Sequence, residues 1–283
     1  MKKMKKKLNF DVCTFCNHKC SFCSNSDDRT IKYQTSLEEF RSVMQNTLRY
    51  VKIEEIGLSA KGEVLVNNDF TKIVHCAKEE FSIPYIYIST NGALLDEKKA
   101  TEVIEAGLDS IKFSINALER ESYKEVHKKD DFDRVVANFR TLLRLKKARY
   151  PKLKLFLSSV IDKTNAELDE GFKTLFSENF ELINGISLYP LTYTPKFNEI
   201  KTTQQPTKKC PIPFNELYIN SDGTLGLCCK DYFDEINFGS LLENDFMEVY
   251  NSNSFKKVRE MHKKSKFPDG HLCKNCLLYD GGI

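Results

Sequence analysis

Eleven residues near the start of the chain, CTFCNHKCSFC at positions 13–23, contain four cysteines. Thiolates ligate zinc and iron–sulfur clusters and also carry out redox chemistry. A second group lies towards the other end of the chain: Cys210, Cys228, Cys229, Cys273 and Cys276. The remaining cysteine, Cys76, lies on the apolar side of a predicted helix, and we expect it to be a small core side chain. In a reducing compartment, clustered thiols of this kind indicate metal or redox ligands rather than disulfides.

The composition excludes several classes of function. The chain has 283 residues, 41% hydrophobic and 29% charged, which suits one substantial core and a smaller second domain. A formal net charge of +3 gives no electrostatic case for nucleic-acid binding. No apolar stretch has the length of a signal peptide or a membrane span, so we expect a cytoplasmic protein with no membrane partner. The basic opening MKKMKKK is interpreted as a solvated tail.

Short apolar runs alternate with helical stretches through the first two thirds of the chain. Strands are predicted over residues 8–12, 53–59, 84–90, 109–115, 152–161 and 183–191. Helices are predicted over residues 35–51, 69–81, 96–107, 132–148 and 165–178, the first capped by Thr35 or Ser36. Six β-α units in a row predict a parallel sheet with helices outside, either doubly wound or a complete or partial barrel. In both folds, chemistry collects at the carboxyl ends of the strands.

The last third of the chain has a different organisation. Residues 191–209 lack periodicity and contain two prolines, which predicts a connecting segment between a core at 1–190 and a small α+β domain at 210–283. Within that domain we expect strands at 216–220 and 224–229, joined by a hairpin turn. Two short helices are expected within residues 240–251 and 254–264.

The spacing of the N-terminal cysteines is informative. The run C-x2-C-x3-C-x2-C matches neither the widely separated pairs of a structural zinc site nor the C-x2-C-x2-C-x3-C run of ferredoxins. Without Cys13, the pattern is Cys16-x3-Cys20-x2-Cys23. Three thiolates on one loop can hold three irons of a cubane [4Fe–4S] cluster, and the fourth iron is left open to a ligand.

This pattern resembles that of the radical S-adenosylmethionine (radical SAM) family, and the resemblance continues at later strand ends. The resemblance implies that the cofactor-binding residues are Gly62, Glu63, Thr90, Asn91 and Ser114. Glu63 would receive the methionine amino group, although Ala60-Lys61 and Val64 depart from the family's usual Gly-Gly-Glu-Pro. The implied fold is a partial (β/α)6 TIM-like barrel with a small C-terminal α+β cluster-binding domain. Taken singly, a solvated carboxylate, an ordinary turn and a satisfied strand hydroxyl explain these residues equally well.

The C-terminal cysteines resemble the SPASM or twitch extension of the same family. The resemblance implies one auxiliary [4Fe–4S] cluster ligated by Cys210, Cys228, Cys273 and Cys276, with zinc as the alternative metal. Two thiols remain, Cys13 and Cys229. Either they are inert, or one of them donates a hydrogen atom to a substrate radical.

The family resemblance implies a reaction. S-adenosylmethionine would bind the open iron, an external reductant of flavodoxin or ferredoxin type would supply one electron, and the resulting 5′-deoxyadenosyl radical would abstract a hydrogen atom from substrate. The auxiliary cluster favours an oxidative, dehydrogenase-type outcome. The lack of a leader-binding domain favours a small molecule such as a sugar or aminocyclitol. The alternatives are a peptide- or protein-modifying epimerase or cross-linking enzyme, and a zinc-binding module without catalysis.

Overall fold

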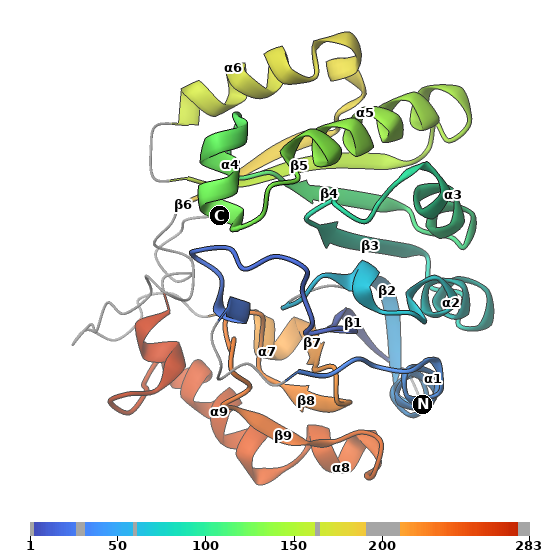
Figure 1. The fold of residues 1–283 in the computed structure, drawn as a ribbon. Helices are drawn as coiled ribbons and strands as arrows, with labels where there is room; N and C mark the ends of the chain where they lie inside the picture. The colour runs from blue at the N-terminus through green and yellow to red at the C-terminus, as the bar shows by residue number, and fades with distance from the viewer. Residues whose placement is uncertain (1–2, 27–31, 59–60, 162–164, 191–209, 277–283) are drawn as a thin grey trace.

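The computed structural model describes residues 3–26, 32–58, 61–161, 165–190 and 210–276. Nine strands form one sheet in the order β6-β5-β4-β3-β2-β1-β7-β8-β9 (Figure 1). They are β1 (Met4–Phe10), β2 (Val51–Gly57), β3 (Tyr85–Thr90), β4 (Ser110–Ser114), β5 (Lys154–Ile161), β6 (Gly185–Pro190), β7 (Glu216–Ile219), β8 (Thr224–Gly226) and β9 (Asn237–Ser240). Within the described ranges β6 pairs with β5 alone, so the sheet forms the predicted partial barrel of six parallel strands.

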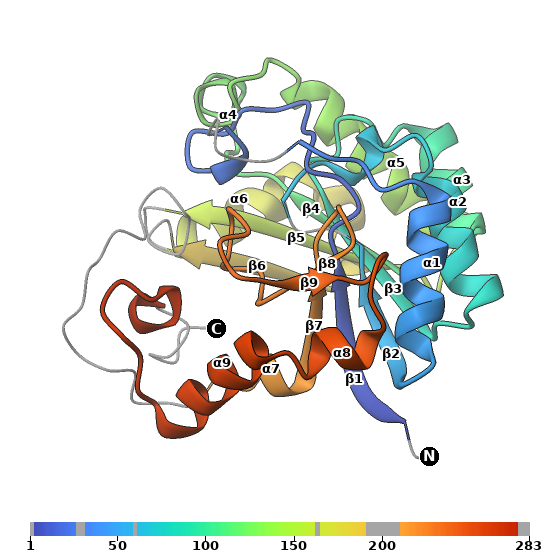
Figure 2. The same ribbon diagram turned by 90° about the horizontal axis from the view of Figure 1, so that it is seen from below.

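Helices follow most of the parallel strands, as the sequence predicts. They are α1 (Leu37–Leu48), α2 (Phe70–His75), α3 (Glu97–Glu105), α4 (Arg120–His127), α5 (Phe132–Ala148), α6 (Asn165–Leu175), α7 (Ile212–Asn215), α8 (Phe246–Tyr250) and α9 (Asn253–Lys264). Helices α1, α2, α3 and α5 lie in succession along one side of the sheet (Figure 2). The first begins at a capping box of Ser36 and Glu39. The short 3-10 and π turns are η1 (Ser24–Ser26), η2 (Val64–Val66), η3 (Cys76–Glu80), η4 (Ser177–Leu182) and η7 (Leu272–Asn275).

The two faces of the parallel sheet differ in burial. In β3, Ile86 and Ile88 are buried in the core, whereas Tyr85 and Tyr87 alternate with them and keep partial exposure. Successive strand side chains point to opposite faces, so the helices cover one face and the other carries half-buried polar side chains. We call this second face the inner face. Cys76 is 1% exposed, which confirms its predicted place in the core.

Strand β1 begins earlier than predicted. The lysine-rich opening is a strand from Met4, so its interpretation as a solvated tail is wrong. Parallel pairing with β2 explains the difference: Met4 pairs with Val51, and Lys5 and Lys7 form ion pairs with Glu54 (3.0 Å) and Glu55 (2.9 Å). Cross-strand charge pairs of this kind let lysines occupy strand positions.

The C-terminal region extends the same sheet. Strand β7 runs parallel to β1, with Leu217 opposite Leu8, and β8 and β9 continue antiparallel from it (Figure 1). The predicted hairpin is confirmed, but β8 ends at Gly226, so the predicted strand through Cys229 is wrong. The chain turns at Cys228 instead of continuing as a strand, and Asp231 N donates to Cys228 O across this turn. The segments 191–209 and 277–283 lie outside the described residues. No helix in the described part of the chain has the length and apolarity needed to cross a membrane.

Candidate active site

The loop that carries the first cysteines follows β1 and is held from several sides. Thr14 N donates to Tyr33 O (2.9 Å), and the Asn25 side chain donates to Thr14 O (2.7 Å). On the other side, Ser21 N donates to the backbone of α4 at Val126 (2.9 Å). The loop is therefore fixed against both the segment that precedes α1 and the helix that follows β4.

Within this loop Cys16, Cys20 and Cys23 form a group of half-buried thiols. Burial, together with the charges of Glu63 and Cys23, raises the pKa of Cys16 to about 12, against the opposing effect of the His18 N–H. Burial, Cys23 and Cys16 raise the pKa of Cys20 in the same way. Thiolates in such a site need the positive charge of bound metal.

Each of these sulfurs lies near an N–H group or an imidazole nitrogen. His18 N donates to Cys16 Sγ (3.5 Å) and Asn25 N donates to Cys23 Sγ (3.4 Å), while His127 Nδ1 lies 3.6 Å from Cys20 Sγ. Hydrogen bonds to thiolate sulfurs accompany iron–sulfur ligation. The three side chains therefore fit the cluster that the spacing predicts.

Cys13 differs from the other three. It is fully buried, its Sγ lies 3.6 Å from Phe15 O, and burial raises its pKa to about 11. The charges acting on it are those of Asp11, Glu63 and Lys32. Its thiol thus contacts the backbone of its own loop, and its role as a hydrogen-atom donor stays a prediction.

The loop after β2 packs directly on the cysteine loop. A Cβ atom at Gly62 would lie 2.3 Å from Cys13 O and 2.5 Å from Phe15 O, so only glycine fits this approach. The next residue, Glu63, donates its N–H to Phe15 O (2.8 Å). Gly62 is thus needed for backbone packing, whatever it contributes to cofactor binding.

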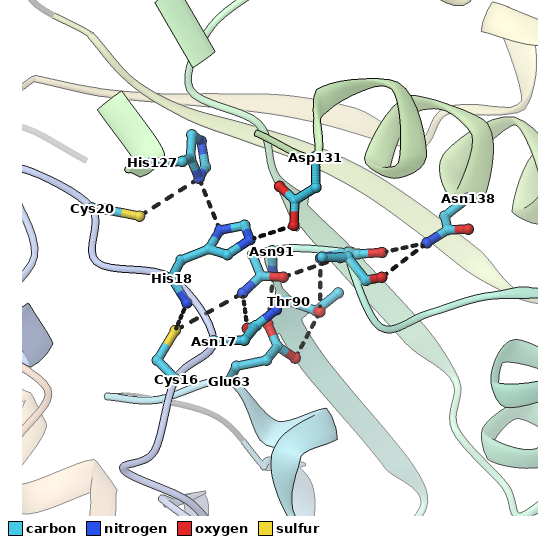
Figure 3. Close-up of polar contacts among 12 residues, drawn as sticks. Cys16, Asn17, His18, Cys20, Glu63, Thr90, Asn91, His127, Asp131 and Asn138 are labelled. Atoms are coloured by element: carbon cyan, nitrogen blue, oxygen red, sulfur yellow. Dashed lines mark hydrogen bonds and ion pairs between the residues drawn. The ribbon is translucent and has the colours of Figure 1, made fainter. Parts of the chain in front are cut away.

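Glu63 links two other predicted cofactor-binding residues (Figure 3). Its carboxylate accepts from Thr90 Oγ1 (2.8 Å) and Asn91 N (2.7 Å), and burial raises its pKa. Asn91 in turn donates to Asn17 Oδ1 (2.8 Å) and lies 3.9 Å from Cys16 Sγ. The structure therefore brings Glu63, Thr90 and Asn91 to the edge of the cysteine loop. Their contacts with S-adenosylmethionine stay predictions.

Ser114 lies further along the strand ends. It is the last residue of β4, and its Oγ lies 3.2 Å from Ser158 Oγ of β5 on the inner face. Its half-buried hydroxyl keeps capacity for a ligand.

The C-terminal cysteines line one small pocket. It is enclosed by Cys210, Cys228, Cys273 and Cys276 together with Ile212, Pro213, Leu227, Leu272, Lys230 and His262. Burial and the charges of neighbouring cysteines raise the pKa of Cys228 and of Cys273. A largely apolar pocket with four converging thiols fits an iron–sulfur cluster. Cys229 does not line it and is exposed.

Comparison with known proteins agrees with this geometry. The family model described as the radical SAM superfamily matches residues 11–174, more than half of the chain. The chain belongs to the radical SAM superfamily. The SPASM model, described as an iron-sulfur cluster-binding domain, matches residues 210–277 and favours iron–sulfur over zinc there. The protein is therefore a radical SAM enzyme with a C-terminal SPASM domain, and its cofactors are S-adenosylmethionine, the [4Fe–4S] cluster that binds it and auxiliary iron–sulfur.

Curated relatives of this radical SAM chain include GTP 3′,8-cyclases. The Chlorobaculum tepidum enzyme is 30% identical over 44% of this chain and 37% of its own length. The probable cyclase of Methanocaldococcus jannaschii is 26% identical over 69% of this chain and 65% of its own length. The chain thus spans less than two thirds of either relative. The Cronobacter sakazakii cyclase is 24% identical over 98% of this chain and 81% of its own length.

Solved structures show the same radical SAM fold. BtrN in complex with AdoMet and 2-DOIA has a TM-score of 0.61 at 18% identity, covering 98% of this chain and 94% of BtrN. Streptococcus suis SuiB bound to its precursor peptide SuiA has a TM-score of 0.68 at 14% identity, covering 99% of this chain and 72% of SuiB. At these identities the likeness shows the fold alone.

Lys61, which departs from the family's glycine, has a structural role in this radical SAM enzyme. Its side chain is almost fully buried, forms an ion pair with Asp234 and lies 3.4 Å from Asn220 Oδ1. The fully buried Asp11 also interacts with it: burial raises the pKa of Asp11 to about 7, and Lys61 opposes that rise. Lys61 therefore links the cofactor loop to the SPASM region.

Replacing Lys61 with methionine should lower the free energy of unfolding by about 3 kcal/mol at pH 8, because it leaves the buried Asp11 and the partly buried Asp234 without their cation. The loss should be smaller at pH 5. The pKa of Asp11 is about 7 in the folded protein and near its ordinary value of 3.8 in the unfolded chain. Between these two values the folded state holds a proton that the unfolded chain has released. The free energy of unfolding therefore falls as the pH rises from about 4 to 7. Without Lys61, the pKa of Asp11 rises further and this fall in stability deepens.

Urea unfolding of the anaerobically reconstituted protein at both pH values measures this effect. The matched control is Lys72→Met, which removes an exposed ion pair with Asp69 (2.9 Å) and should change stability by less than about 0.5 kcal/mol. An equal loss at pH 5 and pH 8 would show that Lys61 does not act through Asp11 and Asp234.

Proposed function

We propose that this chain binds S-adenosylmethionine at a cluster on Cys16, Cys20 and Cys23 and oxidises a small polar molecule such as a sugar or aminocyclitol. The observation that carries the proposal is the set of three half-buried thiols, two with backbone N–H donors and one beside an imidazole. The fourth thiol of the loop, Cys13, instead contacts the backbone at Phe15. When bound, the reduced cluster and S-adenosylmethionine supply hydrogen-atom abstraction from an unactivated C–H bond. An external one-electron reductant belongs to this proposal.

The chain's own residues prepare that site. Glu63 fixes Thr90 and Asn91 against the cysteine loop, so the strand ends that face the cofactor are rigid. Preorganised groups of this kind orient the reacting atoms without rearrangement. In the SPASM region, Cys210, Cys228, Cys273 and Cys276 would ligate one auxiliary cluster that accepts the second electron when the substrate is oxidised.

The inner face supports a substrate rich in hydroxyl or amino groups. Asn9 of β1 accepts from Tyr87 Oη of β3 (3.2 Å) and donates to Glu216 Oε2 of β7 (3.1 Å). The Tyr87 ring reaches across β2 at Gly57, where a Cβ would lie 2.7 Å from the ring. Further along, Lys112 Nζ lies 3.3 Å from Tyr189 Oη. These half-buried donors and acceptors suit the hydrogen bonding of a polyhydroxylated ligand.

Deuterium transfer tests the proposal. The reconstituted enzyme, S-adenosylmethionine and dithionite are incubated with deuterated sugars, aminocyclitols and peptides, and the mass of 5′-deoxyadenosine is measured. We expect deuterium from a sugar or aminocyclitol C–H and an oxidised product. Transfer from a peptide alone would replace the small-molecule assignment with a peptide-modifying one. Absence of S-adenosylmethionine cleavage by iron-replete enzyme would refute the catalytic proposal.

A further inference from the structure

A buried polar network adjoins Cys20 (Figure 3), and the function proposed above uses only the presence of an imidazole beside that sulfur. His127 at the end of α4 places Nδ1 3.6 Å from Cys20 Sγ and 3.2 Å from Nδ1 of His18 in the cysteine loop. His18 Nε2 lies 3.1 Å from Asp131 Oδ2, at the start of α5. Both imidazoles and the carboxylate are buried. The network thus joins a predicted cluster ligand to two helices.

Asn116, after β4, determines which nitrogen of His127 carries the proton. Asn116 Oδ1 accepts from Val160 N (2.7 Å), so its amide NH2 group faces the imidazole. Both Asn116 Nδ2 (3.1 Å) and Asn116 N (3.3 Å) then point at His127 Nε2, which must accept. In a neutral imidazole the single proton therefore lies on Nδ1. The ring is almost completely buried, which favours its neutral form.

The Nδ1–H group of His127 has two acceptors. One is His18 Nδ1, which is free to accept because the other ring nitrogen donates to Asp131. The other is Cys20 Sγ. A thiolate that ligates iron carries negative charge and accepts more strongly than a neutral imidazole nitrogen. The two acceptors therefore compete, and reduction of the cluster shifts the competition towards sulfur.

We propose that His127 is a positioning residue that donates its Nδ1–H to Cys20 Sγ and so raises the reduction potential of the cluster that Cys20 ligates. The inference rests on the proposed cluster site. An added electron increases the negative charge on the thiolates, so a donor aimed at one of them stabilises the reduced form more than the oxidised form. His18 moderates the effect because it shares the same proton.

A redox titration of the full-length, anaerobically reconstituted protein tests this role. Dithionite and mediators set the potential, and electron paramagnetic resonance measures the reduced cluster; the signal that changes on adding S-adenosylmethionine identifies the cluster concerned. In His127→Phe, the ratio of reduced to oxidised cluster at a fixed potential should fall about tenfold, which corresponds to about 59 mV. His127→Asn, whose amide nitrogen can replace Nδ1–H, should restore most of that ratio.

Two further variants separate hydrogen bonding from disturbed packing. His18→Gln keeps an N–H donor for Asp131 and replaces the ring acceptor Nδ1 with an amide oxygen that is not held beside His127 Nδ1, so the ratio should change in the opposite direction and rise. Tyr123→Phe is the matched control, because it keeps the ring that stacks on His127 at 3.9 Å and removes only a hydroxyl that interacts with Asp131, not with His127 or Cys20. It should leave the ratio unchanged. Damage to packing would instead change the ratio of reduced to oxidised cluster in the same direction in all of these variants.

The outcomes separate this inference from the proposed function. A full iron content with an unchanged potential in His127→Phe, or a fall in the ratio in His18→Gln, would overturn the role of His127 alone. If the His127→Phe protein does not accumulate, the direction in which His18→Gln changes the ratio of reduced to oxidised cluster still tests the role of His127. If Cys20→Ala keeps the S-adenosylmethionine-responsive signal, the proposed cluster site itself is wrong. Binding of one zinc ion that is lost in both histidine variants would instead indicate a metal site of His18, Cys20 and His127.

Discussion

Cys20→Ala should reduce S-adenosylmethionine cleavage to below about one-thousandth of the wild-type rate, because residues that act as one unit fail together. Cys20 is one of three thiols that the loop brings together, and alanine leaves one iron of the cubane without a protein ligand. Iron and sulfide contents should fall to about half, since the SPASM site would keep its own cluster. Anaerobic metal analysis and quantification of 5′-deoxyadenosine measure the two effects.

Cys13→Ala is the matched control from the same loop. Its thiol is buried and turned towards Phe15 O, so iron content and cleavage should stay within a few-fold of wild type. Cys76→Ala controls for loss of a core thiol remote from both cysteine groups. The reverse pattern, in which Cys13→Ala loses the cluster and Cys20→Ala keeps it, would contradict the three-thiolate site.

Local sequence patterns predicted much of this fold. The six parallel strands and most of their helices follow from hydrophobic periodicity and capping, of which Ser36 and Glu39 are an example. The cysteine spacing predicted the group of Cys16, Cys20 and Cys23, whose charges act on one another, and its role as a cluster site stays a prediction. Their neighbours were less predictable, because contacts such as that of Cys20 with His127 join residues 107 apart in the chain. The one local signal was a histidine inside the cysteine loop, at position 18.

The errors have a common physical cause, which is tertiary pairing that overrides local preference. Lys5 and Lys7 lie in a strand because β1 pairs with β2, where Glu54 and Glu55 are within reach of the two ammonium groups. The apolar run after Thr224 predicted a long strand, but its end turns away where Cys228 enters the cysteine pocket. Lys61 departs from the family pattern because its cation pairs with Asp234 in the SPASM region. None of these partners is adjacent in sequence.

Loss of the auxiliary cluster should separate cleavage of S-adenosylmethionine from oxidation of the substrate. Cys276 lines the C-terminal pocket and is half-buried, so Cys276→Ala removes a ligand at less cost to folding than a change at the buried Cys228 or Cys273. 5′-Deoxyadenosine formation should stay within a few-fold of wild type, whereas oxidised product should fall by at least about 100-fold. The first step depends on the other cysteine loop, and only the second electron transfer needs this pocket.

The ratio of oxidised product to 5′-deoxyadenosine, measured with the deuterated substrate, reports this separation. Cys229→Ala is the matched control: the thiol is adjacent in sequence to Cys228 but is exposed and lies outside the pocket lining. It should keep the wild-type ratio if Cys229 is inert. A raised ratio would support its role as a hydrogen-atom donor, because a substrate radical that receives no hydrogen atom is left to be oxidised. An unchanged ratio in Cys276→Ala with auxiliary iron absent would show that the second electron leaves by another route. The dehydrogenase-type assignment would then lose the structural feature that favours it.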